Sequence, residues 1–70
     1  MNSKALEMKM LEKDVSVDQL CEAARMCRAS FYRKIKGERQ FLQREIKAIA
    51  ELLELTDSEI REIFFTAAVS

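Results

Sequence analysis

The sequence contains no proline and one glycine, Gly37, so it has few residues that break helices. No segment alternates apolar and polar residues with the period of two that is typical of a β-strand. Apolar residues instead recur at intervals of three and four, as they do along one face of a helix. We therefore expect an all-α protein. Its 70 residues suffice for one hydrophobic core, and so for a single domain over residues 1–70.

Five helices are expected from this spacing and from residues that cap helix ends. Two of the starts have the spacing of a capping box, because Ser16 precedes Gln19 and Thr56 precedes Glu59 by three residues. A third start has Ser3 as its candidate N-cap. The expected helices span residues 3–13, 16–24, 28–36 and 43–54, and a last one runs from residue 56 onward.

Apolar side chains at helical spacing are expected to form the core. In the first helix Leu6 and Met10 lie four residues apart, with Met8 or Leu11 completing the apolar stripe. Met26 is expected to fill the turn between the second and third helices. The other expected core residues are Leu20, Cys21, Ala24, Phe31, Ile35, Ile46, Ile49, Ala50, Leu53, Ile60, Ile63 and Phe64.

Residues that commonly carry catalysis or bind metals are scarce. The chain has no histidine and only two cysteines, Cys21 and Cys27, which are too few for a four-ligand zinc site. It also lacks the commonest general base and any glycine-rich phosphate loop, so we expect no enzyme activity, no cofactor and no metal. The apolar runs are too short to span a bilayer, and the N-terminus lacks the pattern of a signal peptide. We therefore expect a cytoplasmic protein without membrane contact.

The charges are unevenly distributed, although 12 Lys and Arg balance 12 Asp and Glu overall. Residues 1–24 hold three Lys and five acids, a net charge of −2, and residues 48–70 hold one Arg and five acids, a net charge of −4. Residues 25–47 hold eight Lys or Arg and two Glu, a net charge of +6. Because phosphate binding needs local positive charge, we expect an anionic partner to contact the middle of the chain.

The basic segment contains two short expected helices joined by a tight turn, which is the layout of a DNA-binding helix-turn-helix. Phe31 and Ile35, four residues apart, are expected to anchor the second of these helices to the core. The opposite face of that helix then points outward and suits the major groove of DNA. The residues expected on it are Arg28, Ala29, Tyr32, Arg33 and Lys36, with Ser30 and Lys34 at the margins.

Several segments of the chain match the pattern of one known family. They are SVDQL at 16–20, CRASFYRKIKG at 27–37, Phe41, Glu45-Ile46, LTDSEI at 55–60 and IFF at 63–65. Over nearly its whole length the chain thereby resembles the lambda-repressor-like (phage repressor, Cro and Xre type) helix-turn-helix domains. The resemblance implies a compact five-helix DNA-binding domain whose third helix enters the major groove. It also implies a transcriptional regulator that binds double-stranded DNA, usually as a homodimer on an inverted-repeat operator.

The resemblance also implies roles for individual residues. Base contacts would fall on Arg28, Ala29 or Ser30, Tyr32 and Arg33. An arginine suits the O6 and N7 atoms of guanine, and an alanine suits the methyl group of thymine, while Tyr32 fits either a base or a phosphate. The residues expected to contact phosphates are Lys34, Lys36, Arg39 and Arg44.

The chain departs from the family pattern at five positions. Asp14 and Arg25 stand where glycine is usual, so a left-handed backbone there carries a steric cost. Val17 replaces a glutamine that clamps a phosphate in the family. Cys27 and Leu42 replace the usual Ser or Thr caps of the third and fourth helices. None of these five positions is among the residues expected on the outward face of the third helix.

The end of the chain holds apolar residues that the predicted core does not claim, namely Phe65, Ala68 and Val69. They form a candidate dimerisation surface, because one short recognition helix contacts too few base pairs to select an operator alone. The other interpretation is that Phe65 packs back onto the first helix. A second class of function also fits the sequence, a protein-interaction module such as an antitoxin or antirepressor built on the same fold.

Overall fold

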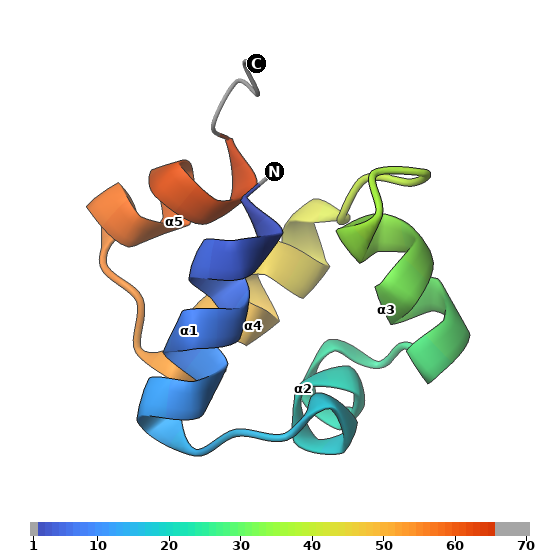
Figure 1. The fold of residues 1–70 in the computed structure, drawn as a ribbon, viewed down its shortest axis with the longest axis horizontal. Coiled ribbons are helices and arrows are strands. Elements are labelled where there is room, and N and C mark those ends of the chain that lie inside the picture. Colours follow the sequence, from blue (N-terminus) through green and yellow to red (C-terminus); the bar gives the residue numbers. More distant parts are fainter. Residues whose placement is uncertain (1, 66–70) are drawn as a thin grey trace.

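The structure is a computed structural model of the chain, and it describes residues 2–65. Within that range it contains five helices and no strand, which confirms the all-α prediction (Figure 1). Each helix lies within about a residue of its predicted bounds. The helices are α1 (Ser3–Lys13), α2 (Val17–Ala24), α3 (Arg28–Ile35), α4 (Gln43–Leu53) and α5 (Asp57–Phe64).

Helix α4 is the centre of the arrangement, since it packs against α1, α2 and α5. Helices α1 and α5 also pack against each other, and the main helix contact of α3 is with α2. As a result α3 and α5 lie at opposite sides of the molecule (Figure 1). One face of α3 is thereby left without a helix packed on it.

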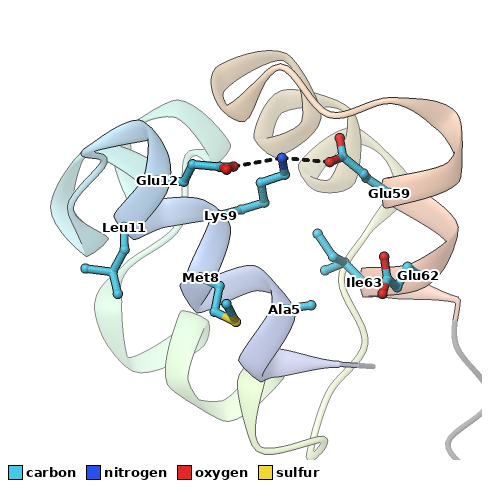
Figure 2. Close-up of a pocket in the computed structure, with 8 residues that line it drawn as sticks. All are labelled: Ala5, Met8, Lys9, Leu11, Glu12, Glu59, Glu62 and Ile63. Carbon is cyan, nitrogen blue, oxygen red and sulfur yellow. Dashed lines mark hydrogen bonds and ion pairs between the residues drawn. The ribbon is translucent and has the colours of Figure 1, made fainter.

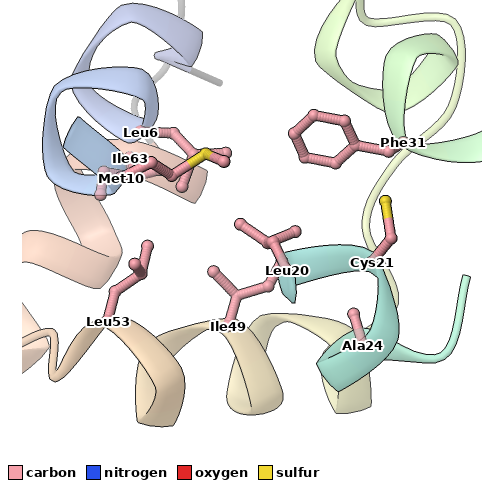
Figure 3. Close-up of a cluster of buried hydrophobic side chains, with 9 residues drawn as sticks. All are labelled: Leu6, Met10, Leu20, Cys21, Ala24, Phe31, Ile49, Leu53 and Ile63. Carbon is pink, nitrogen blue, oxygen red and sulfur yellow. The ribbon is translucent and has the colours of Figure 1, made fainter. Parts of the chain in front are cut away.

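The core lies between these helices and consists of the residues that the apolar spacing predicted. Its fully buried side chains include Leu6 of α1, Leu20 of α2 and Ile49 of α4 (Figure 3). Met26 packs half-buried against this cluster, as predicted for the residue that fills the turn. The other buried apolar residues are Met10, Cys21, Ala24, Phe31, Ala50, Leu53 and Ile63. Ile35, Ile46, Ile60 and Phe64 are half-buried.

Two predictions about α1 are wrong. Met8 and Leu11 do not join the core, because their side chains are 66% and 82% exposed. Leu6 and Met10 already occupy the inward face, and at about 100° per residue Met8 and Leu11 point away from it. The N-cap is Asn2 and not Ser3, since Asn2 Oδ1 accepts a hydrogen bond from Ala5 N–H at 3.1 Å.

Both predicted capping boxes are present. Ser16 Oγ accepts from Gln19 N–H at 3.1 Å, and Gln19 Oε1 accepts from Ser16 N–H at 2.8 Å. Thr56 and Glu59 make the same reciprocal pair at 3.2 and 2.9 Å. Each box satisfies two backbone donors that have no partner within their helix, and so fixes where the helix begins.

Left-handed residues end three of the helices. Asp14, Arg25 and Glu54 follow α1, α2 and α4 with φ angles of 58°, 58° and 55°. Gly37 has φ 88° one residue beyond the C-cap of α3, as expected for the glycine that stops this helix. Only glycine adopts this conformation without steric cost, so the three other helix ends carry strain.

Candidate nucleic-acid interface

Three residues connect α2 to α3, as the sequence predicted. Arg25 turns the chain through its left-handed conformation, and Met26 N–H donates to Cys21 O at 3.0 Å. Cys27 is the N-cap of α3, because its Sγ accepts from Ser30 N–H at 3.4 Å. This connection is short and hydrogen-bonded, so it holds α3 in a defined direction relative to α2.

Helix α3 is anchored on one face and open on the other. Phe31 is 3% exposed and Ile35 is half-buried, which confirms the predicted anchor. Phe31 also makes an edge-to-face contact with Phe41 at 6.3 Å between ring centroids. The side chains predicted to point outward are all exposed, namely Arg28, Ala29, Tyr32, Arg33 and Lys36, and Ser30 lies half-exposed at the margin. We call these five exposed residues, four in α3 and its C-cap residue Lys36, the α3 outer face.

The α3 outer face includes an ion pair that sequence reasoning missed. Arg28 Nε lies 3.4 Å from Asp18 Oδ1 of α2, and both side chains are mostly exposed. An exposed pair of this kind contributes little to stability. Asp18 does, however, compete with any anionic ligand for Arg28. Asp18 falls in the first turn of its helix, where acidic residues are common for reasons of the helix dipole, so its sequence position did not mark it.

Tyr32 is held by packing although it is 44% exposed. Its ring lies edge-to-face against Phe31 with centroids 5.4 Å apart. A surface groove next to it is lined by Leu11 of α1, Val17 of α2 and Ile35 of α3. The tyrosine thus presents a fixed polar and aromatic edge beside Arg33.

The predicted position of Lys34 at the helix margin is wrong. Its side chain is 8% exposed, and its Nζ lies 2.5 Å from Oε1 of Glu45, a carboxylate that is 3% exposed. The ammonium group also lies 5.8 Å from the centre of the Phe41 ring. Because these partners enclose it, Lys34 is not available to a phosphate. No sequence pattern predicts a contact between two residues that are eleven positions apart on different helices.

The remaining predicted phosphate contacts are exposed. Lys36 and Arg39 belong to the loop of residues 36–42, which follows α3. Arg44 in the first turn of α4 is exposed as well, and one of its guanidinium nitrogens donates to Ala24 O at 3.3 Å. This bond satisfies a carbonyl at the end of α2, so Arg44 links α4 to α2 while part of its charge faces solvent.

The pKa of Glu45 lies below its ordinary value. Burial by itself raises the pKa, but the hydrogen bonds from Lys34 and from the backbone of Leu42, together with the charges of Lys34 and Arg44, outweigh it. The carboxylate is therefore ionised over the whole neutral range.

The two cysteines differ in their surroundings. Burial raises the pKa of Cys21, whereas the hydrogen bond from Ser30 N–H at the start of α3 lowers the pKa of the exposed Cys27. Both are free thiols. Across residues 2–65 no cluster of three or more potential metal ligands occurs, and no helix there is long and apolar enough to cross a membrane.

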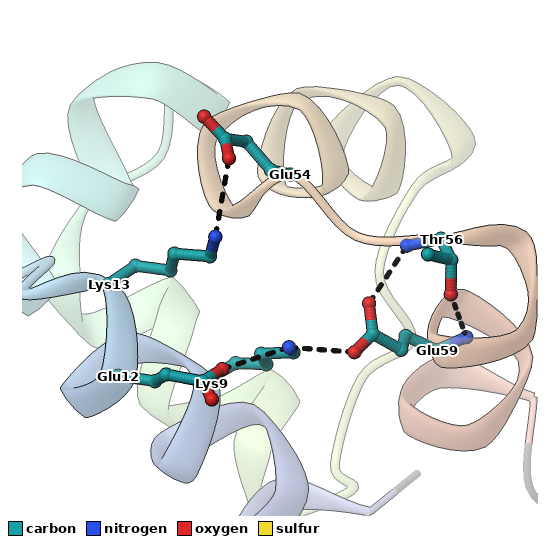
Figure 4. A network of polar contacts seen from close by, with 6 residues as sticks. All are labelled: Lys9, Glu12, Lys13, Glu54, Thr56 and Glu59. Carbon is teal, nitrogen blue, oxygen red and sulfur yellow. Dashed lines mark hydrogen bonds and ion pairs between the residues drawn. The ribbon is translucent and has the colours of Figure 1, made fainter.

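A second groove lies between α1 and α5. Ala5, Met8 and Leu11 of α1 line a groove against Glu62 and Ile63 of α5 (Figure 2). Above it, Lys9 bridges Glu12 at 2.9 Å and Glu59 at 2.7 Å (Figure 4). These contacts, with that to Glu59 the larger, raise the pKa of Lys9 to about 12. Lys13 similarly contacts Glu54 at 3.2 Å. Lys9 and Lys13 of α1 are thus paired with acidic side chains.

The predicted dimerisation residues are only partly described. Ala68 and Val69 lie outside the described residues. Phe65 is 63% exposed and lines a groove with Ile46 and Ala50 of α4. The alternative that Phe65 packs onto the first helix is therefore wrong. The end of the chain is not alone in exposing large apolar side chains, since Met8, Leu11 and Leu42 are exposed too.

Comparisons of the chain with protein families, with curated proteins and with solved structures find no match. The likeness to lambda-repressor-like domains therefore depends on the sequence segments quoted above.

Proposed function

We propose that this protein is a sequence-specific regulator of transcription that inserts α3 into the major groove of double-stranded DNA, as lambda-repressor-like domains do. The observation that carries the proposal is the α3 outer face. A short helix, pinned at Phe31 and preceded by a tight turn from α2, directs two arginines, a lysine and a tyrosine to solvent from one side. An α-helix with such a face has the width and the donors that the major groove requires.

The roles in this proposal follow from position. Arg28 and Arg33 carry planar guanidinium groups that pair with guanine, and Ala29 is small enough to contact a thymine methyl group. Tyr32 and Ser30 supply hydroxyl groups at the edge of the face. The positive charges that follow α3, Lys36, Arg39 and Arg44, contact phosphates and set the register of the helix on the duplex.

The acidic remainder of the molecule supports the same orientation. Residues 25–47 carry a net charge of +6, while the segments on either side carry −2 and −4. Phosphates are attracted to the first segment and repelled by the other two, so the duplex approaches from the side of α3 and the following loop.

The test compares Arg33→Ala with Lys36→Ala. Arg33→Ala is expected to weaken binding to the preferred site by about 1 to 3 kcal/mol and to relax the preference at one base pair. Lys36→Ala is expected to weaken binding to all duplexes alike, because it contacts a phosphate. Selection from random duplex DNA identifies the preferred site, and gel shifts at two salt concentrations measure both effects.

Equal losses on the preferred site and on random DNA for both variants would refute the assignment of roles. Absence of any selected site for the wild-type protein, with no salt-dependent binding to random duplex, would refute the DNA-binding proposal itself.

A protein-interaction module is the second candidate, and the exposed Met8 and Leu11 favour it. Apolar side chains that lie together on a surface commonly mark a contact with another protein. The double charge reversal Arg28→Glu/Arg33→Glu separates the two functions. It is expected to abolish DNA binding, whereas recognition of a protein partner through α1 does not need cations on α3. Regulatory activity in cells that persists in this double variant, and disappears in Leu11→Asp, would favour the second function.

A further inference from the structure

The end of α3 is fastened to the start of α4 by a buried ion pair. The side chains of Lys34 and Glu45 are 8% and 3% exposed, and their Nζ and Oε1 atoms lie 2.5 Å apart. Phe41 covers the ammonium group at 5.8 Å and itself contacts Phe31 and Phe64 edge to face. No buried side-chain nitrogen or oxygen within residues 2–65 lacks a hydrogen-bond partner, so neither member of the pair leaves a buried polar atom unpaired.

Glu45 also begins α4. The N-cap residue Leu42 has no polar side chain, and Glu45 Oε1 accepts the Leu42 N–H at 2.8 Å. The same oxygen atom accepts from Lys34 Nζ. One carboxylate therefore fixes the first turn of α4 and the last turn of α3 at once, which a serine or threonine cap in place of Leu42 would not do.

The ion pair closes the base of the loop between the two helices. The loop starts with hydrogen bonds from Gly37 N–H to Lys34 O at 3.1 Å and from Glu38 N–H to Arg33 O at 2.9 Å. Farther along it exposes Arg39 to solvent. The positions of the loop cations relative to α3 thus depend on where Lys34 and Glu45 hold the two ends of the loop.

Stability alone is a poor reason for such a pair. Removing two charges from water costs free energy that their attraction barely repays, and apolar side chains of similar volume often stabilise such a site equally well or better. What an ion pair adds is direction, since its geometry is favourable at one distance and orientation. Here it joins the helix that carries the base-reading side chains to the loop that carries the phosphate-binding ones.

We propose that the buried pair of Lys34 and Glu45 is a positioning clasp, which sets α3 and the loop of residues 36–42 in register so that both sets of cations meet DNA together. Neither residue contacts DNA. This inference rests on the proposed function for its consequence, but the clasp can be tested in the free protein.

The test uses the double variant Lys34→Met/Glu45→Gln. Glutamine still accepts the Leu42 N–H, methionine fills the space of the lysine, and no lone charge is left in the interior. Thermal unfolding is expected near the wild-type temperature. Affinity for the selected site relative to random duplex is expected to fall about tenfold, the loss that displacing one base contact causes.

Salt dependence separates positioning from phosphate contact. On random duplex, binding needs no register between α3 and the loop, so the salt slope there reports phosphate contacts alone. If Lys34 bound a phosphate, its removal would reduce the magnitude of the slope of log affinity against log salt by about 0.9. The clasp predicts an unchanged slope on random duplex for the double variant and a smaller one for Lys36→Ala, the exposed control. A smaller slope on random duplex in the double variant overturns the proposal, and so does unchanged discrimination in a folded double variant.

Hydrogen exchange tests the clasp without DNA. In the double variant the amide protons of Gly37 and Glu38 are expected to exchange about tenfold faster than in wild type, while that of Leu20 in α2 keeps its protection. Equal exchange at Gly37 and Glu38 in both proteins overturns the clasp, whether or not the protein binds DNA. Faster exchange there in a protein that selects no DNA site leaves the clasp standing and refutes only the proposed function.

Discussion

At the scale of single residues, the backbone of Arg25 is the clearest source of avoidable strain. It is left-handed at the end of α2, where a side chain costs about 1 to 2 kcal/mol relative to glycine. Arg25→Gly is expected to raise the free energy of unfolding by about 1 kcal/mol, or the melting temperature by about 4 to 8 °C. Arg25→Ala is the matched control, because it removes the same charge and keeps the Cβ atom. Urea titrations of both variants measure the difference, and equal stability of the two would show that the Cβ atom is not strained.

Residue-level predictions from sequence succeeded where the local pattern decides exposure. Phe31 and Ile35 are four residues apart, so they fix one face of α3 and leave Arg28 and Arg33 on the other. Lys34 was placed wrongly because its burial depends on Glu45, which lies eleven positions later in the sequence on another helix. A contact between residues that are distant in the sequence produces no periodic pattern there, so only the three-dimensional structure shows it.

At the scale of helices, the starts and ends were predictable because caps are local. Ser16 with Gln19 and Thr56 with Glu59 mark two starts within a four-residue window. The start of α1 was less clear, since Asn2 and Ser3 are both good caps and only the hydrogen bond to Ala5 distinguishes them. How α3 is joined to α4 was not predictable, because it depends on a buried pair and on aromatic contacts around Phe41.

The capping carboxylate of α5 makes the stability of the fold dependent on acid. Hydrogen bonds from Lys9, and then from the Thr56 backbone, lower the pKa of Glu59 below its ordinary value of 4.5. A carboxylate whose pKa is depressed by folding stabilises the protein above pH 4.5, and this stabilisation is lost as the pH falls through the lowered value. The melting temperature is therefore expected to decrease as the pH is lowered below 4.5. Glu59→Gln, which still caps Thr56, is expected to melt lower at pH 7 and to lose less on acidification. Melting curves of the two proteins that run parallel from pH 7 to pH 3 would contradict this role.

At the scale of the whole molecule, the surroundings of the positive charges differ from helix to helix. Arg33, Lys36 and Arg39 are exposed on α3 and the loop after it, whereas Lys9 and Lys13 of α1 are paired with glutamates. Besides Tyr32, large apolar side chains are exposed at three places, on α1 at Met8 and Leu11, before α4 at Leu42 and after α5 at Phe65, and Leu11 lines the groove next to Tyr32. The sequence predicted the site at Phe65 and missed the one on α1, because α1 carries more apolar residues than its inward face can bury.

The last prediction decides which of these sites joins two copies on DNA. A single α3 reads only a few base pairs, so selection of one operator among many competing sites calls for a second copy. A two-fold pair places the recognition helices roughly 34 Å apart and requires an inverted repeat with half-sites about one helical turn from centre to centre.

Phe65→Glu is expected to weaken dimerisation and operator binding while the monomer stays folded, because a side chain that is 63% exposed contributes little to the core. Met8→Glu places the same charge on α1, where 66% exposure again protects the fold, and it is expected to leave both properties unchanged, since Met8 does not line the groove next to Tyr32. Sedimentation and footprinting of the two variants measure dimerisation and site occupancy. Loss of dimerisation in Met8→Glu and not in Phe65→Glu would move the interface to α1, and protection of a single unrepeated half-site by the wild-type protein would rule out the dimer.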